Sequence, residues 1–247
     1  MGSRQFHCCQ NSLGSMGIGQ GIQHGKSFMV NGKIFAIGDI HGCADQLRRL
    51  LERLPFDAGR DTLVFLGDYL DRGPDVKGVL DQLCRLRAEG VHLQALMGNH
   101  EYLLLEYHRS QDAALLPYMR RLGMEKTLES YGGASLAELG ALTYMPAEHR
   151  DFLASLLPYW ETDEDIFVHA GLRFGHPLSE QDLSDLCEVR EPFLSDERDY
   201  GKRIIFGHTP FVTPLVTAGK IGIDTGAAYG NLLTAVELPG LRFHHAA

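Results

Sequence analysis

The 247-residue chain lacks a long hydrophobic run, a basic stripe and paired cysteines. No apolar stretch approaches the length of a bilayer span, which argues against a membrane protein. A net charge of -9 without a basic face argues against a generic nucleic-acid binder. The five cysteines form no CxxC pair of the zinc-binding type and are too sparse for a disulfide scaffold, so a reducing cytoplasm fits them best.

The first thirty residues differ from the rest of the chain. Residues 1–30 are rich in Gly, Ser and Gln and lack the charged-then-apolar pattern of a signal peptide, so we interpret them as a flexible tail. The remaining length suits one large α/β domain, which we place at residues 31–247. With 44% hydrophobic and 22% charged residues, the composition is that of a globular protein.

Short apolar runs alternate with amphipathic segments, which predicts an α/β fold. We expect helices at residues 44–54 and 76–86, each between two strands. Residues 101–157 are expected to form a mainly helical cap, broken at Pro117, Gly132-Gly133 and Pro146. The predicted strands cover residues 34–37, 62–66, 91–97, 166–168, 203–206, 215–217, 221–223 and 232–238.

Five polar clusters each follow a predicted strand. They are Gly38-Asp39-Ile40-His41-Gly42, Gly67-Asp68 through Asp71-Arg72-Gly73, Gly98-Asn99-His100-Glu101, His169-Ala170-Gly171 and Gly207-His208. Because the loops after the strands of an α/β sheet open at a common edge, these side chains can meet in one crevice. Carboxylate, amide and imidazole ligands suit hard divalent ions such as Mn²⁺. The pattern therefore predicts a metal site, with Asp68 as the carboxylate that bridges two ions.

The motifs GDIHG, GDYLDRG, GNHE, HAG and GH, in this order, resemble the phosphoprotein phosphatase branch of the metallophosphoesterases over residues 38–208. The segment IDTGAAYGN at 223–231 resembles the closing segment of bacterial members. The resemblance implies a single calcineurin-like domain, a β-sandwich flanked by helices, with a dinuclear metal site at the loops after the strands. HAG in place of the usual HGG is a small departure, and the longer C-terminal extension of eukaryotic members is absent.

The resemblance also implies which residues bind the metals. Asp39, His41 and Asp68 would hold the first ion. Asp68, Asn99, His169 and His208 would hold the second. Manganese is the expected metal, with iron and zinc as alternatives.

The same resemblance implies roles in catalysis for four further residues. His100 would be the general acid that protonates the leaving alkoxide, oriented by Asp71, and such a positioned imidazolium contributes about 10²–10⁴-fold to a rate. Arg72 would bind phosphate oxygens. Arg190 is the candidate for a second phosphate-binding arginine, with a salt bridge to its acidic neighbours as an equally weighted alternative.

The leading hypothesis is a bacterial-type Ser/Thr protein phosphatase of the cytoplasm, which acts on phosphorylated proteins or peptides through a hydroxide that bridges the metals. The alternative enzyme is a symmetrical dinucleoside-polyphosphate hydrolase. Those hydrolases more often have Asp after the Asn-His pair and depart from the DRG pattern, so Glu101 and Asp71-Arg72-Gly73 favour the phosphatase. A catalytically silent scaffold is disfavoured because every ligand that the resemblance implies is present. No nucleic-acid or membrane partner is expected, and the oligomeric state is not predicted.

The remaining histidines and Cys43 are given structural roles. We expect Cys43 to be a small packing residue, and the His244-His245 pair to be a solvated chain end. Histidines outside the motifs are expected at the surface or as satisfied core residues, namely His92, His108, His149 and His176.

Overall fold

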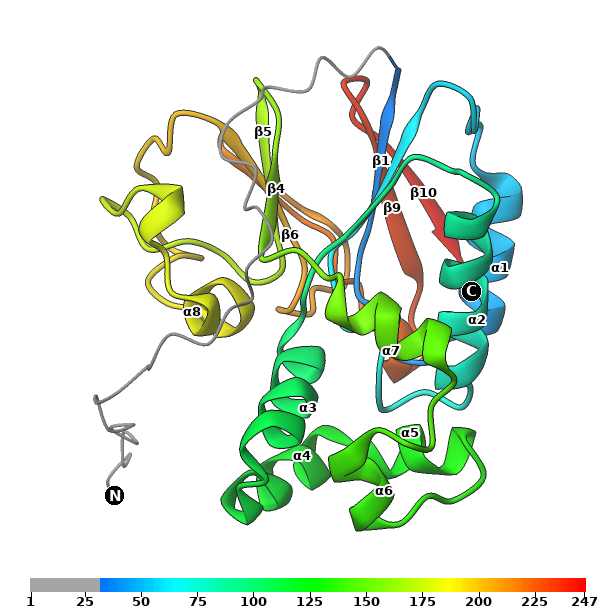
Figure 1. Ribbon diagram of the computed structural model, residues 1–247. Helices are drawn as coiled ribbons and strands as arrows, with labels where there is room; N and C mark the ends of the chain where they lie inside the picture. The colour runs from blue at the N-terminus through cyan, green and yellow to red at the C-terminus, as the bar shows by residue number, and fades with distance from the viewer. Residues whose placement is uncertain (1–31) are drawn as a thin grey trace.

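The computed structural model describes residues 32–247, so the tail predicted for residues 1–30 lies outside the described residues. Two five-stranded sheets lie side by side at the centre, with helices on their outer faces (Figure 1). The strand orders are β10-β9-β1-β2-β3 in the first sheet and β4-β5-β6-β8-β7 in the second. This is the helix-flanked sandwich that the motifs implied.

The first sheet has a parallel core. Strands β1, β2 and β3 are parallel, whereas β9 pairs antiparallel with both β1 and β10. Helices α1 and α2 connect the parallel strands and cover the outer face (Figure 1). The bounds are β1 (Ile34–Ile37), α1 (Ala44–Arg53), β2 (Thr62–Phe65), α2 (Val76–Ala88), β3 (Leu93–Ala95), β9 (Leu233–Leu238) and β10 (Arg242–Ala246).

The second sheet repeats this plan. Its parallel core is β5, β6 and β8, with β4 and β7 paired antiparallel at the two edges. Helix α8 lies on its outer side (Figure 1). The bounds are β4 (Tyr159–Glu161), β5 (Asp165–Val168), η2 (Leu178–Glu180), α8 (Leu183–Glu188), β6 (Arg203–Phe206), β7 (Leu215–Val216), β8 (Lys220–Gly222) and η3 (Ala227–Tyr229).

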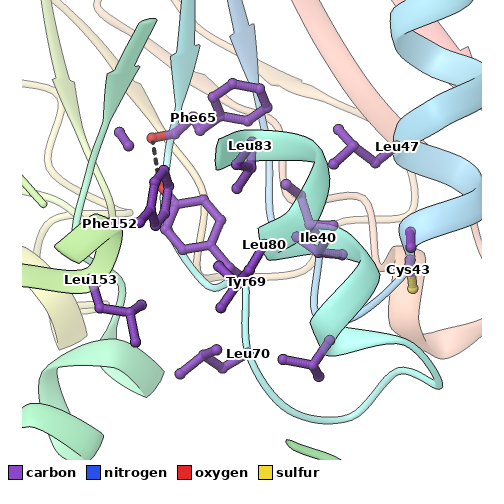
Figure 2. Close-up of a cluster of buried hydrophobic side chains, with 14 of the residues drawn as sticks. Ile40, Cys43, Leu47, Phe65, Tyr69, Leu70, Leu80, Leu83, Phe152 and Leu153 are labelled. Carbon is purple, nitrogen blue, oxygen red and sulfur yellow. Dashed lines mark hydrogen bonds between the residues drawn. The ribbon is translucent and has the colours of Figure 1, made fainter. Parts of the chain in front are cut away.

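Alternation along each central strand assigns its side chains to two separate cores. In β1, Phe35 and Ile37 join the core beneath the helices, while Ile34 and Ala36 join the core between the sheets. Figure 2 shows part of the helix-side core, where the Tyr69 hydroxyl donates to the Phe65 carbonyl at 3.3 Å. Strands β1 and β2 are buried at every position, and all of these residues except Thr62 are apolar, because both faces of the strands are covered.

The chain between β3 and β4 forms the cap, where a mainly helical segment was predicted. It consists of five helices and a short 3₁₀ turn. The predicted break lies just before Pro117, because α3 ends at Ser110 and α4 begins at Leu116, with Pro117 in its first turn, where proline is well tolerated. A further break that was not predicted falls at Gly123, whose φ of 97° ends α4. The elements are α3 (Asn99–Ser110), η1 (Ala113–Leu115), α4 (Leu116–Leu122), α5 (Met124–Ser130), α6 (Leu136–Ala141) and α7 (Ala147–Ala154).

The prediction for the C-terminal His244-His245 pair, at the edge of the first sheet, was wrong. The His244-His245 pair is not a solvated end but part of β10, where the His245 ring lies 2.8 Å from the Thr234 hydroxyl and His244 pairs with Glu237 at 3.1 Å. Strand β4 was also absent from the predicted strands. No helix within residues 32–247 has the length and apolarity to span a bilayer.

Removing the Phe167 ring tests the core between the sheets. Phe167 is fully buried there and packs against Trp160 at a ring distance of 5.1 Å. We expect Phe167→Ala to lower the free energy of unfolding by about 3–5 kcal/mol in urea denaturation, because it opens a cavity between two sheets that cannot collapse. Phe167→Leu, which keeps most of the volume, is the control. Equal losses for the two variants would contradict the packing argument.

Candidate metal centre

The predicted ligands follow the ends of parallel strands in both sheets. Asp39 and Asp68 come after β1 and β2, and His169 and His208 come after β5 and β6. Because parallel strands end at the same edge, the two sheets bring these loops together. Two groups of potential ligands share Asp68, with ligand atoms within 4.8 Å of one another in each: His41, Asp68 and His100, and Asp68, His169 and His208.

The backbone at this site is strained. Positive φ angles, which are uncommon in residues other than glycine, occur at His41 (45°), Asp68 (53°), Asp71 (67°), Arg72 (60°) and His208 (62°). Such conformations persist where the surrounding contacts hold them, and they concentrate at functional sites. The Asp68 side chain lies so close to Gly98 that only glycine fits there, because a Cβ at this position would lie 2.2 Å from an Asp68 carboxylate oxygen.

Two imidazoles are oriented by backbone carbonyls. His41 Nδ1 donates to the Leu70 carbonyl and His169 Nδ1 to the Leu66 carbonyl, both at 2.8 Å. The opposite nitrogens therefore face Asp68, at 3.2 Å from His41 Nε2 and 3.4 Å from His169 Nε2. Histidines that bind metals are commonly oriented in this way, with the second ring nitrogen held by an acceptor.

Asn99, His208 and Asp39 complete the set of predicted ligands. The Asn99 side-chain oxygen lies 3.0 Å from His208 Nδ1 and 3.3 Å from His169 Nε2. The backbone N–H of His208 donates to both Asp39 carboxylate oxygens at 3.1 Å. The structure thus brings all six predicted ligands into one cluster, in which His208 is half-buried and the other five are buried.

The electrostatics of the cluster favour cations. Burial, together with the Asp224 carboxylate, raises the pKa of Asp39 well above its usual range. Burial alone would lower the pKa of His169, but the carboxylates of Asp68 and Asp39 outweigh it and raise this pKa to about 10. The buried negative charge thus draws a proton onto His169. A divalent ion bound by these residues would take the place of that proton, so the donor set fits the metals that the motifs implied.

The predicted acid and its orienting carboxylate lie together. His100 Nδ1 donates to Asp71 Oδ2 at 2.6 Å, and the imidazole is 2% exposed. His100 Nε2 lies 3.8 Å from Asp68 Oδ2 and has no hydrogen-bond partner among residues 32–247. The second Asp71 oxygen accepts a hydrogen bond from Thr127, a residue that no motif indicated.

The two predicted arginines border the cluster from different loops. Arg72 Nη1 lies 2.5 Å from His41 Nε2, and the Arg72 guanidinium lies over the Tyr229 ring at 5.4 Å. Arg190 Nε donates to His208 Nε2 at 3.3 Å. In the described part of the chain Arg190 forms no ion pair with Glu188 or Glu191, so the salt-bridge alternative was wrong.

Glu101 has a structural role that the sequence analysis did not predict. Its fully buried carboxylate accepts four backbone N–H groups, from Asp68 (2.9 Å), Tyr69 (2.9 Å), Leu70 (3.1 Å) and Gly98 (3.1 Å). These bonds join the loop after β2 to the start of α3. A glutamate at the third position of a helix is a known capping signal, which could have indicated part of this arrangement.

The histidines and the cysteine outside the motifs lie at the surface or pack in the core, as expected. His149 is buried against the Tyr131 hydroxyl at 2.7 Å, and His92 and His176 are exposed. His108 Nδ1 donates to the Gly140 carbonyl at 2.7 Å. Cys43 packs in the helix-side core, as predicted, and burial raises the pKa of its thiol to about 11.

Oxygen and imidazole donors around one shared carboxylate suit divalent ions, and the adjacent guanidinium groups suit a phosphate ester. Fold and site together define a metal-dependent phosphoesterase. The model of the calcineurin-like phosphoesterase family matches residues 32–224, and the chain belongs to that family.

Relatives of the chain act on different substrates according to their names. The chain is 29% identical over 234 residues to the asymmetrical bis(5′-nucleosyl)-tetraphosphatase PrpE of Oceanobacillus iheyensis, covering 85% of this chain and 90% of the relative. It is also 29% identical over 214 residues to serine/threonine-protein phosphatase 1 of Salmonella typhimurium, covering 83% and 91%. A crystal structure of a candidate diadenosine tetraphosphatase superimposes with a TM-score of 0.68 at 25% identity, covering 88% and 94%. Family membership therefore establishes the chemistry and leaves the substrate to be proposed.

Replacing Glu101 by glutamine tests its role in the site. An amide nitrogen cannot accept N–H groups, so Glu101→Gln leaves about half of the four donors unpaired and is expected to lower the free energy of unfolding by about 2–3 kcal/mol. Because the loop that carries Asp68 is displaced, Mn²⁺ affinity in calorimetry is expected to fall about 10–100-fold.

The control for this variant is Glu237→Gln. Glu237 is also buried, but it lies in β9, where it pairs with Lys33 away from the metal cluster. We expect this control to leave Mn²⁺ affinity unchanged. Wild-type Mn²⁺ affinity in Glu101→Gln would show that the four hydrogen bonds do not position the ligands.

Proposed function

We propose that the chain is a manganese-dependent Ser/Thr protein phosphatase that acts on phosphorylated proteins in the cytoplasm. The observation that supports this substrate most directly is the buried pair of His100 and Asp71. One nitrogen of His100 is bound by Asp71 at 2.6 Å, and the other has no hydrogen-bond partner in the described residues. This arrangement suits donation of a proton to a poor leaving group such as a serine or threonine alkoxide.

In this proposal the six clustered ligands hold two divalent ions, which when bound supply a nucleophilic water and neutralise phosphate charge. Asp39, His41 and Asp68 would hold one ion, and Asp68 would be shared with a second set of Asn99, His169 and His208. The donors are hard oxygens and imidazoles without a thiolate, which favours manganese.

The arginines then bind the phosphate from two directions. Arg72 lies beside His41, a ligand of the first set, and Arg190 lies beside His208, a ligand of the second. A phosphate between the two sets of ligands would meet a guanidinium on each side. This placement supports phosphate binding by both residues, because guanidinium groups pair well with phosphate oxygens.

The proposed location rests on the thiols. Cys43, Cys84 and Cys187 are free, and two of them are buried. Free cysteines are typical of a reducing compartment, which supports the cytoplasm as the site of action.

Activity on two substrates tests the proposal. Metal-stripped protein is titrated with Mn²⁺ and assayed on a phosphothreonine peptide beside diadenosine tetraphosphate. We expect Mn²⁺-dependent phosphate release with a higher kcat/KM for the peptide, and a fall in peptide kcat of about 10²–10⁴-fold in His100→Asn. The exposed His176→Asn is the matched control and should retain activity. Selective cleavage of the dinucleotide would overturn the proposed substrate.

Hydrolysis of a dinucleoside polyphosphate is the second candidate function. The names of several relatives favour it, and so does one feature of the site. Tyr229 is 64% exposed although its ring lies beside the Arg72 guanidinium at 5.4 Å. An exposed aromatic ring next to a phosphate-binding arginine could stack on a nucleobase.

Tyr229 variants separate the two candidates. If the ring stacks on a base, Tyr229→Ala lowers kcat/KM for diadenosine tetraphosphate by about 5–150-fold, while Tyr229→Phe, which keeps the ring, does not. The phosphothreonine peptide serves as the reference substrate for both variants. Equal effects of Tyr229→Ala on the two substrates would exclude base stacking and leave the tyrosine as a support for Arg72.

A further inference from the structure

We propose that Thr127, in the cap helix α5, is a positioning residue for the general acid. The inference rests on the role proposed above for His100. The Thr127 hydroxyl donates to Asp71 Oδ1 at 2.5 Å, and the Asp71 backbone N–H donates to the same hydroxyl oxygen at 3.0 Å. The other carboxylate oxygen of Asp71 accepts from His100 Nδ1 at 2.6 Å. Thr127 thus contacts the reacting imidazole only through Asp71.

The two hydrogen bonds of Thr127 fix both the side chain and the backbone of Asp71. Because each carboxylate oxygen has its own donor, the carboxylate cannot rotate without losing a bond to Thr127 or to His100. The Asp71 backbone has a φ of 67°, a strained conformation that needs surrounding contacts to persist. The bond from the Asp71 N–H to Thr127 is one such contact.

The cap packs on the same dipeptide at a second point. A Cβ at Gly123, between α4 and α5, would lie 3.2 Å from the backbone nitrogen of Arg72. Arg72 itself has a φ of 60°. The start of α5 therefore contacts both the residue that orients the acid and the arginine predicted to bind phosphate. Thr127 supplies the polar contact and Gly123 the close approach.

The surroundings of Thr127 make its hydroxyl hard to replace. Thr127 is 2% exposed and Asp71 is 7% exposed. The adjacent cavity has a volume of about 10 Å³ and is lined mainly by apolar side chains, including Leu103 and Met119. That volume is at the lower limit for a single water molecule. Valine has nearly the same shape as threonine, so it would fill the site and exclude a compensating water.

The cap therefore affects protonation of the leaving group, because Thr127 in the cap orients the proposed acid through Asp71. Loss of the Thr127 hydroxyl should free the Asp71 carboxylate to rotate and turn the His100 ring away from the leaving oxygen. Substrates with poor leaving groups depend on that proton, whereas an aryl phosphate depends on it much less. The effect should therefore differ between leaving groups and appear in kcat.

The test compares Thr127→Val with wild type as full-length, Mn²⁺-loaded enzymes on a phosphothreonine peptide and on p-nitrophenyl phosphate. We expect kcat on the peptide to fall by about 10–100-fold, since misplacing a catalytic group by about 1 Å costs on that order. The KM for the peptide and kcat on p-nitrophenyl phosphate are expected to stay near wild type. Thr127→Ser keeps the hydroxyl and is expected to restore peptide activity.

Two controls separate positioning from stability and from the proposed function. Thr162→Val removes another buried threonine hydroxyl, which bonds the backbone of Asp165 at the start of β5, and it should leave both activities unchanged. His100→Asn must itself show the selective loss on the peptide. If it does not, the proposed acid is wrong, and that failure is distinct from a failure of Thr127.

Equal losses on both substrates, or no rescue by Thr127→Ser, would overturn the inference and leave Thr127 with a structural role. If Thr127→Val does not fold, as judged by circular dichroism, Thr127→Ala replaces it in the same comparison. The alanine variant is expected to show the same selective loss on the peptide, and retention of full peptide activity by it would also overturn the inference.

Discussion

The carboxylate of Glu101 is the interaction on which the site depends. It is fully buried and accepts four backbone N–H groups from the loop after β2 and the turn that starts α3. Bonds to an ionised acceptor are strong, and these four offset part of the cost of burial, which together with the Asp68 carboxylate still raises the pKa of Glu101 to about 7. They also hold Asp68 at a φ of 53°, a conformation that the isolated loop would leave. The shared ligand of the metal cluster therefore stays in place because a glutamate outside the cluster binds its backbone.

The two-sheet architecture explains why the site needs the whole fold. Asp39 and Asp68 come from loops of the first sheet, and His169 and His208 come from loops of the second. Neither sheet alone contains both sets of ligands. The apolar core between the sheets thus sets the separation of the ligands as well as the stability of the protein. Packing and chemistry are coupled through this layer.

Substrate choice belongs to a different part of the molecule. Relatives named as nucleotide hydrolases and as a protein phosphatase resemble this chain to a similar degree, which fits a shared metal centre with different surroundings. In this chain those surroundings are the cap, which contacts Asp71 through Thr127, and the exposed ring of Tyr229 beside Arg72. Both lie next to the metal ligands and outside them.

The sequence by itself determined the ligand types and the elements that carry them. The periodicity of residues 34–86 predicted β1, α1, β2 and α2 within about two residues, because the pattern of apolar side chains is local. Only the tertiary structure decided which distant groups meet. Thr127 bonds Asp71 across 56 residues, and Arg190 contacts His208 instead of the glutamates beside it. The residues of β10 have little apolar character, so no local pattern predicts this strand. It forms by pairing with β9. Such pairings depend on how the sheets and the cap pack, and no local pattern encodes that geometry.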